Sequence, residues 1–162
     1  MVSLLGQSCS GPGRVATLKH KRTIIEDRLG KDKFFHFSKS SPLPQMERIS
    51  FKGLNYFPVD IKYWLKAKYV ANQSQDVFKI LTSSGQERVY IKAGRLEFSL
   101  DKKKYTLMAY QEKAMIEQGV DNALFVPFTD LTSGKQSYGA GRYIDLSIPE
   151  GENLDIDFNL AY

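Results

Sequence analysis

Residues 87–111 read ERVYIKAGRLEFSLDKKKYTLMAYQ, and this stretch decides the fold class. Apolar and polar residues alternate along it, and β-branched and aromatic residues are frequent, which is typical of strands with one buried face. The DKKK segment at 101–104 separates two such runs and has the length and polarity of a hairpin loop. The stretch therefore predicts strands at 87–93, 95–100 and 105–111 that are joined in antiparallel order.

The alternating pattern continues on both sides of this stretch. Further strands are predicted at 63–70, 76–82, 123–128, 141–148 and 154–162. The TSSGQ segment joins the second of these runs to the strand that begins at Glu87 and is also of hairpin length. We therefore expect a mainly β fold with a minor α+β component, an antiparallel β-sandwich or partly open barrel with one or two short helices.

Helical patterns are short and lie outside the strands. Thr17 to Leu29 carries a weak apolar stripe and predicts a helix that Gly30 closes, and EKAMIEQG predicts a second short helix. Pro42, Pro44 and Pro58 exclude long regular elements from the segment between the first helix and the first strand. The predicted organisation is a flexible tail and short helix over 1–40, followed by a single β domain over 41–162.

Charge is distributed unevenly along the 162 residues. Residues 1–113 carry 21 Lys/Arg against 10 Asp/Glu, whereas residues 114–162 carry 2 against 8. Basic segments such as DKKK bind phosphates in nucleic-acid-binding proteins, but those proteins also show a recognisable module or stacking aromatics among the basic residues. Since neither is present, we predict no nucleic-acid partner and interpret the lysines as solvated surface residues that the acidic end partly balances.

The opening MVSLLGQSCSGPG is partly similar to the end of a bacterial lipoprotein signal. One hypothesis is a truncated signal in which Cys9 is the lipid-anchored first residue, which would place the protein in the bacterial cell envelope. The alternative is a disordered tail with an inert thiol, and the chain as written is then cytoplasmic. A membrane association is predicted only through this anchor.

Standard cofactor and catalytic motifs fail in the glycine-rich stretch after residue 127. The phosphate-binding loop requires Gly where Thr129 stands and Ser or Thr where Gln136 stands. Ser133 lacks the glycine of a nucleophile elbow, and the two histidines, His20 and His36, both lie in the N-terminal region. We therefore predict no cofactor, no histidine-rich zinc site and no serine–histidine triad.

Three motifs carry a resemblance to a known family. They are FKGLNYFPVD at 51–60, PFTDLTSGKQSYGAGRY at 127–143 and DFNLAY at 157–162. In these motifs the chain resembles an uncharacterised bacterial family called domain of unknown function 1684, from about Ser41 to the end. The resemblance implies no established activity. It also implies a cysteine-containing tail beyond the last motif, whereas this sequence stops at Tyr162.

The acidic end allows a prediction about strand register. Residues 143–148 and 154–160 each have one apolar and one polar face, and the PEGEN segment between them is of hairpin length. Matching the apolar faces sets Asp145 opposite Asp157 and Tyr143 opposite Asn159. Two carboxylates directly opposite each other on neighbouring strands repel, so we expect Arg142, Lys135 or a cation beside the pair.

These considerations predict a small polar site around the glycine-rich turn. Its binding residues are expected to be Asp130, Thr132, Lys135, Tyr138, Arg142, Tyr143, Asp145, Asp157 and Asn159, with Gly134, Gly139 and Gly141 giving positive φ or close backbone approach. The favoured function is a module that binds a small polar ligand or a partner protein. One alternative is a hydrolase with the Asp pair as its site, and another is a structural polar cluster in which Arg142 forms a salt bridge.

Overall fold

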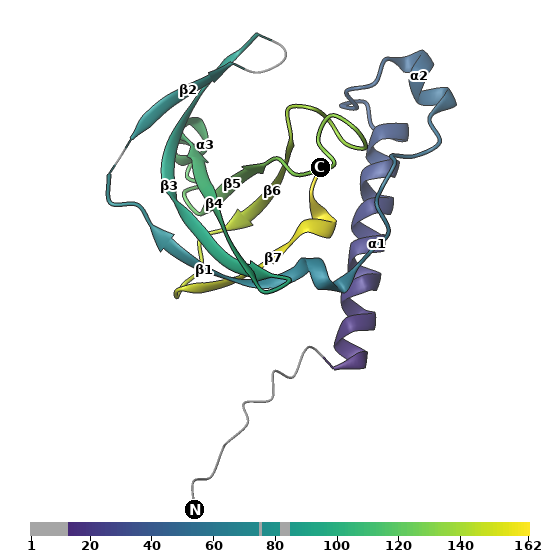
Figure 1. The fold of residues 1–162 in the computed structure, drawn as a ribbon. Coiled ribbons are helices and arrows are strands. Elements are labelled where there is room, and N and C mark those ends of the chain that lie inside the picture. Colours follow the sequence, from purple (N-terminus) through teal and green to yellow (C-terminus); the bar gives the residue numbers. More distant parts are fainter. Residues whose placement is uncertain (1–12, 75, 82–84) are drawn as a thin grey trace, which may run out of the picture. The chain divides into compact units, whose positions relative to one another are not determined.

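The computed structural model describes residues 13–74, 76–81 and 85–162, so the hypothesis about Cys9 lies outside the described residues. The chain divides between Ile61 and Lys62 into two compact units, one helical and one formed by a sheet (Figure 1). The division predicted after residue 40 and the single β domain over 41–162 remain predictions. None of the helices described is both long enough and apolar enough to cross a membrane.

The helical unit contains α1 (Arg14–Phe37) and α2 (Gln45–Ser50). The prediction that Gly30 closes the first helix is wrong, because α1 continues through Gly30 for two further turns. A glycine inside a helix costs about 1 kcal/mol relative to alanine. Two contacts around the extra turns offset this cost. Asp27 pairs with Lys31 at 3.0 Å, and Asp32 accepts a hydrogen bond from the Leu54 amide at 2.9 Å.

The segment after α2 is fastened to α1 by polar contacts. Arg28 Nη1 donates to the Phe57 carbonyl at 2.9 Å, and its guanidinium lies 4.8 Å from the centre of the Tyr56 ring. The Tyr56 hydroxyl lies 3.3 Å from Asp32 Oδ1. Arg28, Asp32 and Tyr56 therefore link this segment to α1.

The second unit is one antiparallel sheet with three short helical elements, the first of which begins at the boundary residue Ile61. Its strands are β1 (Trp64–Ala71), β2 (Val77–Leu81), β3 (Glu87–Leu100), β4 (Lys103–Glu112), β5 (Ala123–Phe128), β6 (Arg142–Ser147) and β7 (Asn153–Asp157). The 3-10 turn η1 (Ile61–Tyr63) precedes β1, the helix α3 (Lys113–Glu117) follows β4, and the 3-10 turn η2 (Phe158–Leu160) follows β7. The strand order is β6-β5-β4-β3-β1-β7, with β2 paired to β3.

The stretch that predicted the fold forms the long hairpin of β3 and β4. Asp101 and Lys102 form its turn with φ values of 51° and 63°, and Leu100 pairs with Lys103. The hairpin is confirmed, but β3 is one strand where the sequence predicted two runs. The pairing of β3 with β4 shifts register between Lys92 and Gly94. Glycine is required at position 94, because a Cβ there would lie 2.5 Å from the Val70 carbonyl oxygen of β1.

The sheet curls around a core that lies on one of its faces (Figure 1). Alternate residues of the strands point inward, as the period of two requires. The buried members are Ala67, Leu96, Phe98, Ala109, Leu124, Val126, Ile144 and Ile156. The structure confirms a mainly antiparallel β fold with few short helices. The sheet is curled as a partly open barrel, and the unit Lys62–Tyr162 is called here the half-barrel.

The predicted hairpin between residues 143–148 and 154–160 is wrong. β6 pairs with β5, which places Asp145 beside Phe125, and β7 pairs with β1, which places Asp157 beside Trp64. The apolar faces of both strands are satisfied by these other neighbours, because a period of two fixes which face is buried but not which strand lies alongside. Curling brings the two edges together at one point, where Tyr143 and Tyr162 exchange backbone hydrogen bonds of 3.0 and 3.2 Å.

Candidate functional site

The glycine-rich loop between β5 and β6 is shaped by two glycines with positive φ. Gly134 has φ 77° and Gly141 has φ 102°, a region that other residues rarely adopt. A Cβ on Gly141 would also lie 2.5 Å from the Phe128 carbonyl oxygen, whereas Gly139 makes only ordinary contact with Gly134. The expectation of positive φ is thus confirmed for Gly134 and Gly141, and Gly141 is required by both conformation and space.

A cluster of polar side chains pins the two ends of this loop. Arg142 Nη2 donates to Asp130 Oδ2 at 2.6 Å, and the other carboxylate oxygen accepts from the amide and hydroxyl of Thr132 at 2.8 and 2.5 Å. The Ser137 hydroxyl lies 2.9 Å from that of Thr132. Residues 130, 132, 137 and 142 therefore form one hydrogen-bonded network, called here the loop network.

The loop network favours the ionised form of Asp130. Burial by itself raises the pKa of this carboxyl group, but the hydrogen bonds from Thr132 and the positive charge of Arg142 outweigh it, so the pKa is lowered. The Arg142 side chain is 17% exposed and that of Asp130 is 39% exposed. The pair is accordingly half-screened by water and serves to fix the loop rather than to supply a proton at neutral pH.

The outer side of the loop exposes large side chains. Leu131 is 91% exposed and Tyr138 is 71% exposed, and Lys135 is exposed between them. Exposed leucine and tyrosine side chains do not contribute the favourable free energy that burying their apolar surface would give. The loop is thus fixed by polar contacts and still presents Leu131 and Tyr138 to solvent.

Two other predicted site residues lie on the opposite face of β6 from Arg142. Because side chains alternate along a strand, Tyr143 and Asp145 point away from the core, whereas Arg142 shares the face of Ile144. The Tyr162 hydroxyl donates to Asp145 Oδ2, and the rings of Tyr143 and Tyr162 lie 4.4 Å apart. Burial and this hydrogen bond raise the pKa of the Tyr162 hydroxyl.

The remaining predicted pair lies at the end of β7. Asp157 is buried and accepts from the backbone amide of Asn159 at 2.9 Å and from its side-chain amide at 2.6 Å, which caps η2. Seven of the nine predicted binding residues thus fall into three local groups, the loop network, the Tyr143–Asp145–Tyr162 group and the Asp157–Asn159 cap. Lys135 and Tyr138 belong to none of them and are exposed. The expectation that Asp145 and Asp157 pair across a ladder is wrong, since each has a different strand partner.

Sequence reasoning missed a row of aromatic rings on the face opposite the core. Successive ring centres lie 4.4 to 6.3 Å apart along Tyr110, Phe78, Tyr90, Phe125, Tyr143 and Tyr162. The available signal was Phe125, an aromatic residue at an outward position between the inward residues Leu124 and Val126. This row gives the sheet apolar packing on its second face.

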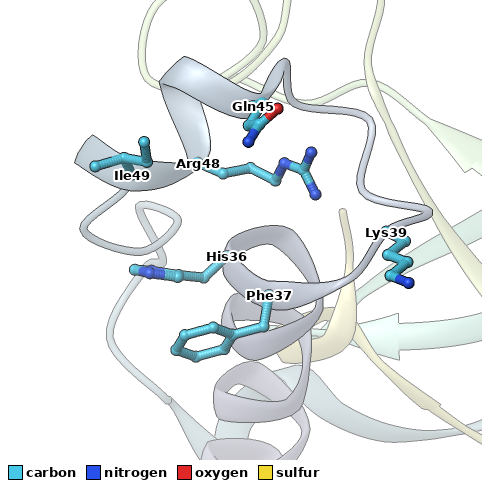
Figure 2. Close-up of a pocket in the computed structure, with 6 residues that line it drawn as sticks. All are labelled: His36, Phe37, Lys39, Gln45, Arg48 and Ile49. Carbon is cyan, nitrogen blue, oxygen red and sulfur yellow. The ribbon is translucent and has the colours of Figure 1, made fainter.

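A hollow in the helical unit was also not predicted from the sequence. It has a volume of about 450 Å³ and lies between the end of α1 and α2. Figure 2 shows its lining, which consists of His36, Phe37, Lys39, Gln45, Arg48 and Ile49. Arg48 Nη1 donates to the Ser38 carbonyl at 2.7 Å and holds α2 against the last turn of α1.

Comparison with known proteins gives a family but no activity. The family model described as "Protein of unknown function (DUF1684)" matches residues 49–162, which include β1 to β7 and the glycine-rich loop. A similar solved structure is the solution NMR structure of an uncharacterized protein of Haloarcula marismortui. It has 34% sequence identity and a TM-score of 0.67, and the match covers 90% of this chain and 79% of that chain. No curated protein matches the chain.

Proposed function

The chain belongs to the family of proteins of unknown function DUF1684, and from this starting point we propose that its half-barrel is a binding module whose glycine-rich loop contacts a partner protein. The observation that carries the proposal is the contrast within that loop. Its inner side is fastened by the loop network, whereas its outer side presents Leu131, Lys135 and Tyr138 to solvent.

The chemistry of the exposed residues favours a protein over a small molecule. Small ligands bind in concave sites that enclose most of their surface, but Leu131 and Tyr138 project outward. Tyrosine is enriched in protein interfaces because its rigid ring buries much apolar area while the hydroxyl keeps a hydrogen bond. A loop held in one conformation before contact also loses less conformational entropy on binding.

The hydrolase alternative is left without its supporting geometry. It required Asp145 and Asp157 to be neighbours across a ladder, and the two residues pair with Phe125 and Trp64 instead. Asp157 also has a capping role at η2 that explains its burial. Among the described residues, no group of three or more His, Cys, Asp or Glu side chains is arranged to hold a metal ion.

A photocrosslinking experiment tests the proposal. A photoreactive phenylalanine analogue replaces Tyr138 in the full chain, expressed in the organism that naturally makes it, and crosslinked species are identified by mass spectrometry. The matched control replaces Tyr105, another exposed tyrosine, on β4. We expect a discrete adduct of one protein at position 138 that is absent at position 105.

Two further variants separate specific from accidental contact. Leu131→Asp and Lys135→Glu each change an exposed residue of the loop and leave the loop network intact, so both chains should fold. Both should abolish the adduct at position 138 if the loop recognises a partner. The same adducts at positions 138 and 105, or an adduct that survives both variants, would contradict the proposal.

A further inference from the structure

Helix α1 carries a stripe of exposed apolar side chains that is separate from its buried face. Val15, Leu18, Ile25 and Leu29 follow one another at intervals of three, seven and four residues, which places them on one side of the helix. All four are exposed, whereas Ile24 is buried on another side. The helix therefore has apolar residues on two sides, and one of these sides faces solvent.

The stripe continues into the hollow at the end of the helix. Leu29 and Phe37 line a second, smaller hollow together with Lys33, and Phe37 and Ile49 line the hollow shown in Figure 2. Phe37 and Ile49 are themselves exposed. From Val15 to Phe37 the helix rises about 33 Å at 1.5 Å per residue, and the ion pair of Arg22 with Glu26 interrupts the apolar side chains on this side.

Positive charge accompanies this surface. Residues 1–61 contain ten Lys/Arg and five Asp/Glu, whereas residues 62–162 contain thirteen of each, so the whole net charge of +5 belongs to the helical unit. The basic residues along α1 are Arg14, Lys19, Lys21, Arg22, Arg28, Lys31 and Lys33, against Glu26, Asp27 and Asp32. Around the hollows lie also Lys39, Arg48 and Lys52. Aliphatic side chains flanked by lysine and arginine are the pattern of helices that lie in a membrane interface.

We propose that α1 and the adjoining hollows form a binding surface for anionic lipid headgroups. The aliphatic stripe enters the boundary between headgroups and acyl chains, and the flanking lysines and arginines contact the headgroup phosphates. The helix lies along the bilayer surface in this arrangement. This surface is distinct from the glycine-rich loop and does not depend on the function proposed for that loop.

Charge and shape favour a lipid surface over other occupants. A second copy of the chain would bring the same excess of positive charge to the stripe, which opposes pairing. A nucleic acid uses positive charge but has no use for a row of aliphatic side chains. An acidic polypeptide shares the charge complementarity and is therefore included as a competitor in the test.

Vesicle flotation with the full chain tests this proposal. The protein is mixed with vesicles of phosphatidylcholine alone, or of phosphatidylcholine with about one third phosphatidylglycerol, at low and at raised salt. We expect binding to the anionic vesicles that weakens with salt, because ions screen the headgroup contacts. Binding to the neutral vesicles should be much weaker, because the lysines and arginines then lack their anionic partners.

Matched substitutions locate the surface. Ile25→Glu on α1 and Val77→Glu on β2 each place a carboxylate at a half-exposed apolar position, 51% and 57% exposed. Ile25→Glu should weaken binding to anionic vesicles roughly tenfold or more, because it removes an inserting side chain and adds a repelled charge. Val77→Glu should leave the affinity within about twofold of the parent, since it changes charge equally outside the surface.

The outcomes decide between the possible occupants. Leu18→Glu provides a second variant of the stripe, and circular dichroism reports whether each variant keeps the helical content of the parent. Equal losses for Ile25→Glu and Val77→Glu, binding that ignores headgroup charge, or no binding at low salt would each overturn the proposal. If the protein binds polyglutamate but does not float with anionic vesicles, the surface is assigned to an acidic polypeptide instead.

Discussion

The helical unit and the half-barrel dispose of apolar side chains in opposite ways. The half-barrel has an aliphatic core in which Leu96, Val126 and Ile156 are almost completely buried, and its charges balance. The helical unit leaves Val15, Leu18 and much of α1 in contact with solvent and carries the whole net positive charge. Stability of the half-barrel is therefore governed by packing, whereas the surface of the helical unit is available for interactions.

The same truncation in the two units makes this difference measurable. Leu96→Ala removes a fully buried side chain and should lower the free energy of unfolding of the half-barrel by about 2–5 kcal/mol. Leu18→Ala removes an exposed side chain from a helix in which alanine is favourable, and it should change stability by less than about 0.5 kcal/mol. Chemical denaturation of both variants measures the contrast, and similar losses for the two would refute it.

The glycine-rich loop should be the most sensitive exposed part of the half-barrel. Gly141→Ala forces a side chain into a backbone with φ 102° and against the Phe128 carbonyl, so we expect a loss of roughly 2 kcal/mol or more. Gly151→Ala is the matched control, because a Cβ at that glycine would meet open space. A Gly141→Ala variant as stable as Gly151→Ala would show that the loop readjusts without strain.

The fold was readable from the sequence because one period repeats along most of the chain. Alternation identified the strands and their buried faces, and DKKK identified the central hairpin. The strand that pairs with β7 could not be predicted, because β1 and β6 both have suitable apolar faces. The choice of β1 depends on the strand order of the whole sheet. The end of α1 was also missed, since Gly30 gives a stop signal that the Asp32 contacts to Leu54 and Tyr56 override.

The candidate site was readable in part for a similar reason. Arg142 and Lys135 are the basic residues that follow Lys113, so the sequence pointed to an acidic partner for one of them. The structure pairs Arg142 with Asp130, twelve residues earlier, in a contact that the loop itself brings about. The aromatic row could not be derived, because it joins five strands whose order depends on long-range pairing.

The loop network should give the half-barrel a pH-dependent contribution that its packing does not. Because the pKa of Asp130 is lowered on folding, its contribution is complete above the unfolded value near 3.8 and is lost as pH falls through the lower folded value. At neutral pH, Asp130→Asn should cost roughly 1 kcal/mol, a modest amount because solvent screens the half-exposed pair. The difference from the parent should disappear in acid.

A double-mutant cycle assigns this contribution to the contact itself. Arg142→Met keeps an apolar stem over Phe128, whose ring centre lies 5.3 Å from the guanidinium, and removes the charge. Asp130→Asn should then cost little in the Arg142→Met background at neutral pH, because the interaction is already absent. Additive losses in the double variant would place the stabilising effect of Asp130 in its hydrogen bonds to Thr132 alone.

The smallest effect expected concerns the polar fastening of the helical unit. Burial, the negative charge of Asp32 and a hydrogen bond to that carboxylate raise the pKa of Tyr56 from 10.0 to about 12. The neutral hydroxyl is thus favoured by folding, and its contribution is present below pH 10 and is lost as pH rises toward 12. Ultraviolet absorbance of tyrosinate should show a late component that loses one tyrosine in Tyr56→Phe, while Tyr162, whose pKa is also raised, continues to titrate late. In Asp32→Asn, which keeps an acceptor oxygen but removes the charge, the titration of Tyr56 should move toward pH 10, since the repulsion against tyrosinate is gone.

A late component unchanged by Tyr56→Phe would mean that other tyrosines are responsible for all of it. The contact between Tyr56 and Asp32 would then contribute nothing to the helical unit, and this part of the contrast between the two units would fail.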